Sequence, residues 1–231
     1  MTFGIIGAME DEIMGLKAKM EITETAKLAG YEFFKGKLCG REVVLVRCGI
    51  GKVNAAVCTQ ALIGKYSPDY IINTGVAGSM DESVGICDIV VSDELVQHDF
   101  STSAFGGYDD GEIPMLGFKY FKADERLIEA ALGTALDTDS HKIHKGRIAT
   151  GDQFISDKDI KSRIKSLFDP LCVEMEGAAI AHACYLNDVS FVVIRSISDN
   201  SDGEADISFE KFVLLAAENS SLIVEKILRC L

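Results

Sequence analysis

The fold of this chain is decided by a pattern that first appears in the stretch Phe3-Gly4-Ile5-Ile6-Gly7-Ala8-Met9-Glu10-Asp11-Glu12. A short apolar run ends in glycine and is followed, a few residues on, by acidic side chains. The same order recurs where Glu176 follows Cys172-Val173 and where Asp199 follows the run Phe191–Ile194. In a chain that alternates strands and helices, such runs are typical of buried parallel strands. We therefore predict an α/β fold in which three acidic side chains lie just beyond strands.

Residues that follow buried strands share one location in such a fold. In open α/β sheets, ligands bind outside the carboxyl ends of the strands. We therefore expect Glu12, Glu176 and Asp199 to converge on one pocket. Three carboxylates in one pocket suit general acid and base catalysis on a substrate that becomes cationic in the transition state, as in the cleavage of a glycosidic bond.

The composition indicates an acidic protein with a substantial core. The chain has 231 residues, 48% of them hydrophobic, and only three prolines, so we expect a single domain spanning residues 1–231. The formal charge of −13 argues against a nucleic-acid surface, which would be basic, and against binding to anionic membranes. No apolar stretch approaches the roughly 20 residues of a membrane span.

Cysteine usage and the first residues favour a cytoplasmic location. The seven cysteines are odd in number and irregularly spaced, which is typical of reduced, buried thiols rather than of a disulfide framework. The start of the chain has neither the basic segment nor the long apolar segment of a signal peptide. His141 and His144 lie three residues apart without a further ligand set, so we expect no metal site.

The order of predicted elements is that of a three-layer α/β protein. We expect strands at 3–7, 70–73, 87–92, 145–150 and 189–196, and a hairpin at 31–47. We expect helices at 11–20, 53–66 and 123–136. A fourth helix is expected to begin after a cap at Ser156 or Asp157 and to end near 168, a fifth to begin at Glu176, and a last one to run from 208 to about 229. The remaining segments are predicted to be a glycine-containing turn at 74–78, a long loop at 99–120 and a polar loop at 199–206.

Each acidic candidate also has a structural interpretation. Acidic residues in a first helical turn, as at Glu10–Glu12, complement the helix dipole whether or not one of them enters a site. Glu176 is either a dipole partner at a helix start or a ligand for a vicinal diol such as that of ribose. Asp199 is either the partner of Arg195 in an ion pair at a strand end or a proton donor whose pKa is tuned by its pocket.

Two glycine-containing segments are weaker evidence for a ligand-binding site. The turn predicted at 74–78 could present backbone N–H groups to an anion or to a ribose. Gly49-Ile50-Gly51-Lys52 suggests a phosphate loop, but it lacks the full glycine spacing and the hydroxyl residue after the lysine. We therefore predict no nucleoside triphosphate site.

Taken in order, five motifs are similar to those of the 5′-methylthioadenosine/S-adenosylhomocysteine nucleosidases, a family of the nucleoside phosphorylase superfamily. The resemblance covers essentially the whole length of the chain. It rests on the segments Gly4–Glu12, Gly49–Ala56, Ile72–Gly78, Val173–Glu176 and Arg195–Asp199. It implies a three-layer α/β fold in which a central mixed β-sheet closes partly into a barrel and is flanked by helices.

The resemblance implies hydrolysis of the N-glycosidic bond of 5′-methylthioadenosine and S-adenosylhomocysteine. The products would be adenine and 5-methylthioribose or S-ribosylhomocysteine, and no cofactor is implied. Glu12 would position and deprotonate the attacking water, and Asp199 would protonate adenine N7. Glu176 would hold the ribose hydroxyls, and Arg195 would help to order the water and the glutamates. An acidic pocket agrees with this chemistry, because ribosyl transfer passes through an oxocarbenium-like state.

The resemblance also implies which residues contact the substrate. Phe154 would stack on the purine, and Ile155 would offer backbone hydrogen bonds to its edge. Phe105, in the long loop, would reach the site from the partner subunit of a homodimer. The other residues implied in substrate binding are Met9, Ile50, Val76, Met175, Ser198 and Phe209.

Two positions depart from the family pattern. Val76 stands where the family often has serine, which removes a hydroxyl from the region expected for water and ribose. Thr102, in the long loop, replaces a residue that is often aliphatic, so the preference among alkylthio groups stays open.

Two other classes of function remain as alternatives. A futalosine hydrolase or a purine nucleoside phosphorylase would belong to the same superfamily, and the phosphorylase alone would require phosphate. Acidic residues where phosphorylases keep a phosphate-binding arginine favour water as the nucleophile. A nucleoside-binding protein without turnover is disfavoured, because a binder needs no proton donor such as Asp199.

Overall fold

The computed structural model describes residues 1–133, 141–199 and 205–231, with the side chains of residues 205–211 outside that description. The strands are β1 (Thr2–Gly7), β2 (Glu21–Leu28), β3 (Tyr31–Leu38), β4 (Arg41–Arg47), β5 (Tyr70–Ser79), β6 (Ile89–Gln97), β7 (Phe121–Lys122), β8 (Ile143–Thr150), β9 (Cys172–Glu174) and β10 (Ser190–Asp199). The α-helices are α1 (Glu10–Lys19), α2 (Lys52–Tyr66), α3 (Glu125–Leu132), α4 (Lys158–Phe168), α5 (Gly177–Leu186) and α6 (Ala205–Cys230).

Five strands of the sheet close into a ring. β5 pairs in parallel with β10, β10 pairs antiparallel with β6, and β6 pairs in parallel with β8. β9 then joins β8 in parallel and returns to β5 as its antiparallel neighbour. From β5 the same sheet extends outward through β1, β4, β3 and β2, while β7 pairs with β6. The mixed, partly barrel-like sheet that the resemblance implied is therefore confirmed.

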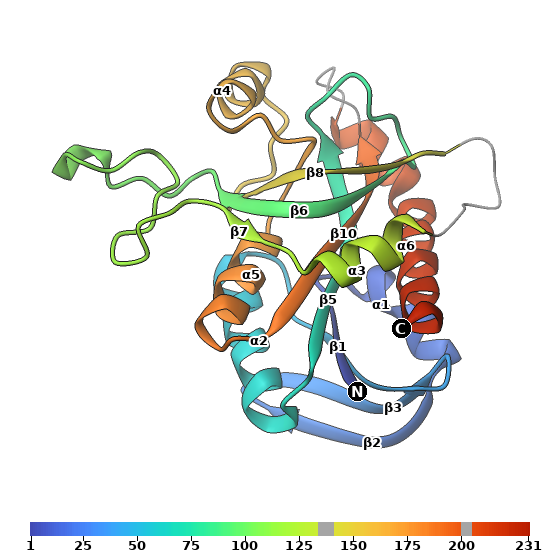
Figure 1. Cartoon of the computed structure of the whole chain (residues 1–231). Coiled ribbons are helices and arrows are strands. Elements are labelled where there is room, and N and C mark those ends of the chain that lie inside the picture. The colour runs from blue at the N-terminus through green and yellow to red at the C-terminus, as the bar shows by residue number, and fades with distance from the viewer. Residues whose placement is uncertain (134–140, 200–204) are drawn as a thin grey trace.

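Helices cover both faces of the extended part of the sheet. Figure 1 shows α2 and α5 on one side, and α1, α3 and α6 on the other. In β4, Val44 and Val46 join the apolar cluster under α2 and α5, whereas Val43 and Leu45 join the cluster under α1, α3 and α6. Because alternate side chains meet different helices, the middle of the strand, residues 43–46, is apolar at every position rather than at every second one. This double coverage explains the continuous apolar runs of the sequence.

The turn predicted at 74–78 is wrong, because β5 continues through this segment to Ser79. β10 pairs with it along this whole length, with Arg195 opposite Gly75, and itself extends to Asp199. Gly75 and Gly78 are required in this strand for a reason other than a turn. A Cβ atom at Gly75 would lie 2.5 Å from Glu12 Oε1, and one at Gly78 would lie 2.7 Å from Asp199 Oδ2. These two glycines allow carboxylates to approach the strand.

Other element boundaries differ modestly from the sequence prediction. The strand expected at 87–92 begins at Ile89 and runs to Gln97, where β8 and β7 supply partners. The edge strand β2 and the two-residue strand β7 were not predicted. The cap expected before α4 is Asp157, whose side chain accepts from the N–H groups of Asp159 and Ile160. The last helix begins at Ala205 rather than at 208.

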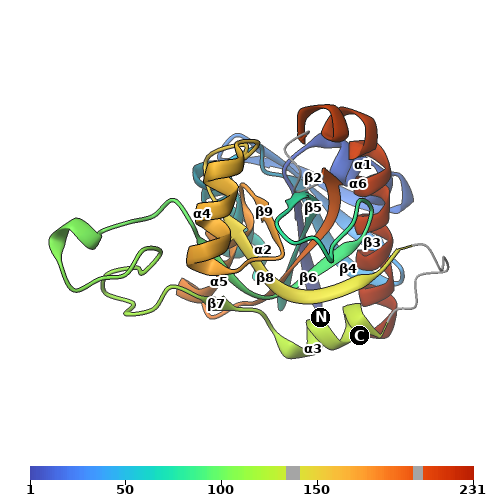
Figure 2. The same ribbon diagram turned by 90° about the horizontal axis from the view of Figure 1, so that it is seen from above.

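The segment predicted as a long loop projects from the rest of the protein. We call residues 99–120 the arm. It contains one short 3₁₀ turn, Ser103–Phe105, and an isolated bridge between Ile113 and Phe118. Figures 1 and 2, which differ by a quarter turn, both show the arm standing away from the sheet and its helices.

Among the helices that the structure describes, none has the length and hydropathy required to cross a membrane.

Candidate active site

A cavity lies where several strands of the sheet end. Met9 follows β1, Ile50 follows β4, and Phe154 follows β8. β5 and β10 contribute from their last residues, and the segment after β9 closes one side. Its walls are formed by Ala8, Met9, Glu12, Ile50, Val76, Ala77, Gly78, Phe154, Val173, Glu174, Met175, Glu176, Ser198 and Asp199. The cavity thus brings together the three carboxylates Glu12, Glu176 and Asp199.

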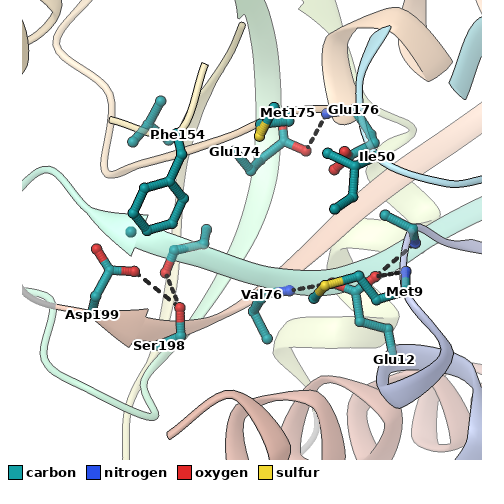
Figure 3. A pocket seen from close by; sticks show the side chains of 14 residues that line it. Met9, Glu12, Ile50, Val76, Phe154, Glu174, Met175, Glu176, Ser198 and Asp199 are labelled. Atoms are coloured by element: carbon teal, nitrogen blue, oxygen red, sulfur yellow. Dashed lines mark hydrogen bonds between the residues drawn. The ribbon is translucent and has the colours of Figure 1, made fainter. Parts of the chain in front are cut away.

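The cavity has two chemically different ends. Figure 3 shows Phe154, Ser198 and Asp199 at one end, and Glu12 with Met9 at the other. Ile155 is buried and lines an adjoining cavity at the Phe154 end, together with Asp199. A flat aromatic ring beside an acidic group suits a heterocycle, whereas the opposite end offers thioether and aliphatic surface beside a carboxylate. The arrangement fits a molecule with a base at one end and an apolar group at the other.

Glu12 combines both interpretations of its acidic cluster. It occupies the third position of α1, and its Oε2 accepts from the N–H groups of Ala8 (2.6 Å) and Met9 (2.9 Å). Its Oε1 accepts from the N–H of Val76 at 3.1 Å, so the same carboxylate that caps the helix also lines the cavity. Burial raises the pKa of Glu12 above its ordinary value, and the Arg195 guanidinium and the three N–H donors offset this only in part. Glu12 is therefore suited to take up a proton.

Arg195 lies behind the cavity wall and is paired with a residue that the sequence reasoning missed. Its guanidinium is 2% exposed and donates to Asn73 Oδ1 at 2.6 Å and to Glu174. Glu174 also accepts from the N–H groups of Glu176 (3.0 Å) and Gly177 (2.7 Å), which cap α5. The same guanidinium lies 3.9 Å from Glu176 Oε2. The signal available in the sequence was that two opposite charges each occur inside an apolar strand, where an unpaired charge is costly.

Glu176 faces the cavity rather than capping its own helix. Its Oε1 accepts from the N–H of Gly51 at 2.8 Å, and its side chain makes no cap hydrogen bond to α5. Burial, followed by the neighbouring Glu174 carboxylate, raises the pKa of Glu176 to about 8. In an empty site this carboxyl group is therefore largely protonated at neutral pH. A ligand that gains positive charge nearby would favour its ionised form.

This raised pKa predicts a pH-dependent cost in stability. The unfolded chain loses the Glu176 proton near pH 4.3, whereas the folded chain keeps it up to about pH 8, so rising pH lowers the stability across that window. Glu176→Gln removes the ionisable group and retains an acceptor for Gly51. We expect this variant to melt about 2 °C or more above the unmodified protein at pH 8, and at the same temperature at pH 4. Thermal melts at both pH values measure this, with exposed Glu218→Gln as the control; an equal effect at both pH values would contradict the explanation.

A β-bulge brings Ser198 and Asp199 to the cavity together. The pairing of β10 with β5 shifts register between Ile197 and Asp199, which breaks the alternation that would point neighbouring side chains to opposite faces. Ser198 Oγ donates to Asp199 Oδ1 at 3.0 Å. Lys161 Nζ lies 4.0 Å from Asp199 Oδ2. Among the described residues, the carboxylates that pair with Arg195 are those of Glu174 and Glu176 rather than that of Asp199.

Three residues that the sequence placed at or near the site are not observed on the cavity wall. Phe105 lies on the arm with 84% of its surface exposed, and neither it nor Thr102 is among the cavity-lining residues. Phe209 lies outside the residues whose side chains the structure describes. Val76 lines the cavity and packs against Met9, Ala216 and Ala217, so an apolar contact with α6 occupies the position where a hydroxyl was expected.

The described part of the cavity wall has acidic and apolar side chains but no lysine, arginine or histidine. Over residues 1–133, 141–199 and the described part of the C-terminal helix, no three His, Cys, Asp or Glu side chains are grouped to hold a metal ion. The titratable side chains on the described part of the wall are those of Glu12, Glu174, Glu176 and Asp199.

Comparison with known proteins agrees with this geometry. A family model described as "Phosphorylase superfamily" matches residues 2–229. A 5′-methylthioadenosine/S-adenosylhomocysteine nucleosidase of Staphylococcus haemolyticus (strain JCSC1435) is 43% identical over 229 residues, covering 99% of each chain. The crystal structure of the nucleosidase of the same name from Neisseria meningitidis, in complex with methylthio-immucillin-A, has a TM-score of 0.94 at 38% identity, covering 100% of this chain and 99% of that one. The native structure of futalosine hydrolase of Helicobacter pylori strain 26695 has a TM-score of 0.93 at 34% identity, covering 100% and 98%.

Proposed function

The chain belongs to the phosphorylase superfamily and, within it, to the 5′-methylthioadenosine/S-adenosylhomocysteine nucleosidases, and we propose that it hydrolyses the N-glycosidic bond of these two nucleosides. The products are adenine and either 5-methylthioribose or S-ribosylhomocysteine. The observation that carries the proposal is the cavity itself, with an aromatic and acidic end for the purine and a second carboxylate at the sugar end.

The proposed roles follow from which groups can hold or release a proton. Asp199, beside Phe154, donates a proton to adenine N7 and so turns the base into a better leaving group. Glu12, whose raised pKa favours proton uptake, positions and deprotonates the water that attacks the sugar. The C–N bond breaks as the water oxygen bonds to the anomeric carbon, and the ribosyl group passes through an oxocarbenium-like state.

The remaining site residues bind the substrate or hold the acids in place. Glu176 accepts hydrogen bonds from the two ribose hydroxyls, and the developing positive charge on the sugar stabilises its ionised form. Arg195 holds Glu174 and lies close to Glu176, and its field also acts on Glu12. Phe154 stacks on the purine, and Ile155 contacts its edge. The sugar and the alkylthio group contact Met9, Ile50, Val76, Met175 and Phe209, and Ser198, which is bonded to Asp199, lies at the end that binds the base.

Water rather than phosphate is the proposed nucleophile. A phosphate dianion needs basic side chains, and the described wall of the cavity offers none. Arg195, which lies behind that wall, is already engaged by Glu174 and Asn73. A phosphate beside the Glu12 carboxylate would also meet a like charge. These contacts favour hydrolysis over phosphorolysis.

The proposal is tested by incubating the purified protein with 5′-methylthioadenosine in phosphate-free buffer and following free adenine by chromatography. We expect adenine to appear at a rate that added phosphate does not change. Adenine released only after phosphate is added would identify a phosphorylase. If futalosine is cleaved and 5′-methylthioadenosine is not, the chain is a futalosine hydrolase; cleavage of neither would indicate a nucleoside-binding protein.

The exposed apolar side chains of the arm and of α2 support the proposal that the protein forms a homodimer. Phe105 and Met115 expose 84% and essentially all of their surface, and Val53 and Val57 form an exposed apolar stripe on α2. Exposed apolar side chains become buried when they form part of a contact with another subunit. In the proposed dimer, Phe105 of one subunit completes the alkylthio end of the other subunit's cavity. Sedimentation velocity should give about twice the chain mass of 25.0 kDa; a species of single-chain mass at micromolar concentration would contradict it.

Two further proposals concern the organisation of the chain and its location. The sheet is continuous from β1 to β10, which supports a single domain over residues 1–231; one cooperative calorimetric transition is expected, and two separate transitions would contradict it. All seven cysteines are free thiols, and five of them are buried, which supports a cytoplasmic location. Cell fractionation tests this location.

A further inference from the structure

The rim of the cavity includes loop residues whose side chains are about half exposed, although Ile155, next to Phe154, is buried in an apolar cluster. Ile50 and Phe154 contribute side chains to the cavity wall, yet they are 53% and 49% exposed. The arm begins beside them at Asp99. Each of these segments follows a different strand, so contacts between the segments restrain their relative positions.

The restraint is a closed set of polar contacts among Lys52, Asp99 and Asp152, which we call the rim clasp. Lys52 Nζ lies 2.5 Å from Asp99 Oδ1, and it also donates to Gln97 Oε1 at 3.2 Å. Asp99 Oδ2 accepts from the Asp152 N–H at 2.8 Å, and Asp152 Oδ1 accepts from the Lys52 N–H at 2.7 Å. The contacts join the start of α2, the base of the arm and the loop after β8.

The ion pair between Lys52 and Asp99 is partly shielded from solvent, whereas Asp152 is exposed. The Lys52 and Asp99 side chains are only 17% and 24% exposed. Burial opposes ionisation of Asp99, but the hydrogen bonds from Lys52 and from the Asp152 N–H prevail and hold the pKa of Asp99 below its ordinary value. Charge-assisted hydrogen bonds of this kind are stronger and geometrically more demanding than neutral ones. The clasp therefore fixes the three loops more firmly than an exposed ion pair would.

The residues of the clasp are direct neighbours of the substrate-facing groups. Gly51, next to Lys52, donates its N–H to Glu176, and a Cβ atom at Gly51 would lie 3.1 Å from Asp152 Oδ1. Asp152 is two residues from Phe154. Movement in the clasp would therefore alter the distance between the aromatic ring and the ribose-facing carboxyl group.

We propose that the rim clasp of Lys52, Asp99 and Asp152 positions the loops that bind the nucleoside, and so sets its affinity without taking part in bond cleavage. This inference rests on the proposed function, because it assumes that Phe154 contacts the base and Glu176 contacts the ribose of the same nucleoside. None of the three clasp residues lines the cavity, so each acts through its neighbours. A change in the clasp should alter substrate binding more than the chemical step.

The test compares KM and kcat for 5′-methylthioadenosine in Lys52→Met with those of the unmodified protein. Losing a charged hydrogen-bond partner corresponds to roughly tenfold in affinity, so KM should rise about tenfold while kcat stays within about twofold. Lys52→Arg should recover most of the affinity. Adding Asp99→Asn to Lys52→Met should recover part of it, because it removes the carboxylate left without its cation. Lys65→Met, on the last turn of the same helix and 4.0 Å from Glu24, is the matched control and should change neither constant.

The outcomes separate this inference from the proposed function. If the unmodified protein releases no adenine, the proposed function fails. If it releases adenine but Lys52→Met leaves KM within twofold, or lowers kcat alone, the clasp does not position the substrate. Should Lys52→Met fail to fold, Asp152→Ala removes only the acceptor of the Lys52 N–H, which links the start of α2 to the loop after β8, and is expected to raise KM several-fold with kcat retained. An unchanged KM in that variant would also overturn the inference.

Discussion

Asp199→Asn is expected to lower kcat for 5′-methylthioadenosine by about 10²–10⁴-fold, the range that a positioned general acid contributes. Asparagine has nearly the shape of aspartate and can still accept the hydrogen bond from Ser198 Oγ. Its amide can donate a hydrogen bond to adenine N7 but cannot transfer a proton to it. The variant should therefore bind the base and fail to release it as a neutral leaving group.

Two measurements distinguish the loss of proton donation by Asp199 from a general disturbance of the pocket. Calorimetric titration with adenine should show affinity close to that of the unmodified protein, because product binding requires no proton transfer. Asp159→Asn, on the exposed first turn of α4, is the control and should retain full turnover. Turnover near normal in Asp199→Asn would rule out the acid role of Asp199, whereas a parallel loss of adenine binding would show that the substitution had disturbed the pocket.

Glu12→Gln is expected to produce the second large loss, again about 10²–10⁴-fold in kcat, since an amide cannot deprotonate the attacking water. The structure also predicts a cost in stability. Both carboxylate oxygens accept N–H groups, from Ala8 and Met9 on one side and Val76 on the other. Replacing one oxygen by an amide NH₂ leaves at least one of these donors without an acceptor, at a cost of about 1–3 kcal/mol.

The loss of activity and the loss of stability are separable for Glu12. Assays well below the melting temperature, together with adenine titration, report on the folded variant alone. Glu10→Gln is the matched control, because Glu10 lies in the same helical turn but is half exposed, 3.6 Å from Arg47. It should keep full turnover. If folded Glu12→Gln hydrolysed the substrate at a normal rate, the water-activating role would be wrong.

Much of the fold could be predicted because local sequence and tertiary environment agree. β1 and β4 each contain a continuous apolar run that helices bury on both faces, a pattern typical of parallel strands. The cap at Asp157 was predictable because the side chain bonds to N–H groups two and three residues away. The glycines at Gly75 and Gly78 were misleading. Glycine is favoured both in a turn and where a carboxylate approaches the backbone closely. Only the tertiary structure, which places Glu12 against Gly75 and Asp199 against Gly78, distinguishes the two cases.

The sequence by itself determined the family, the mixed α/β architecture and the three carboxylates that follow strands, because these depend on residue types at fixed places along the chain. The tertiary structure decided what those groups experience. The bulge in β10 turns Ser198 and Asp199 to the same cavity, and Glu174 rather than Asp199 is the hydrogen-bonded partner of Arg195. Burial, which no local pattern encodes, raises the pKa of Glu12, and burial together with the Glu174 carboxylate raises the pKa of Glu176. Proton affinity depends on which groups folding brings together, and the chain order does not specify those distances.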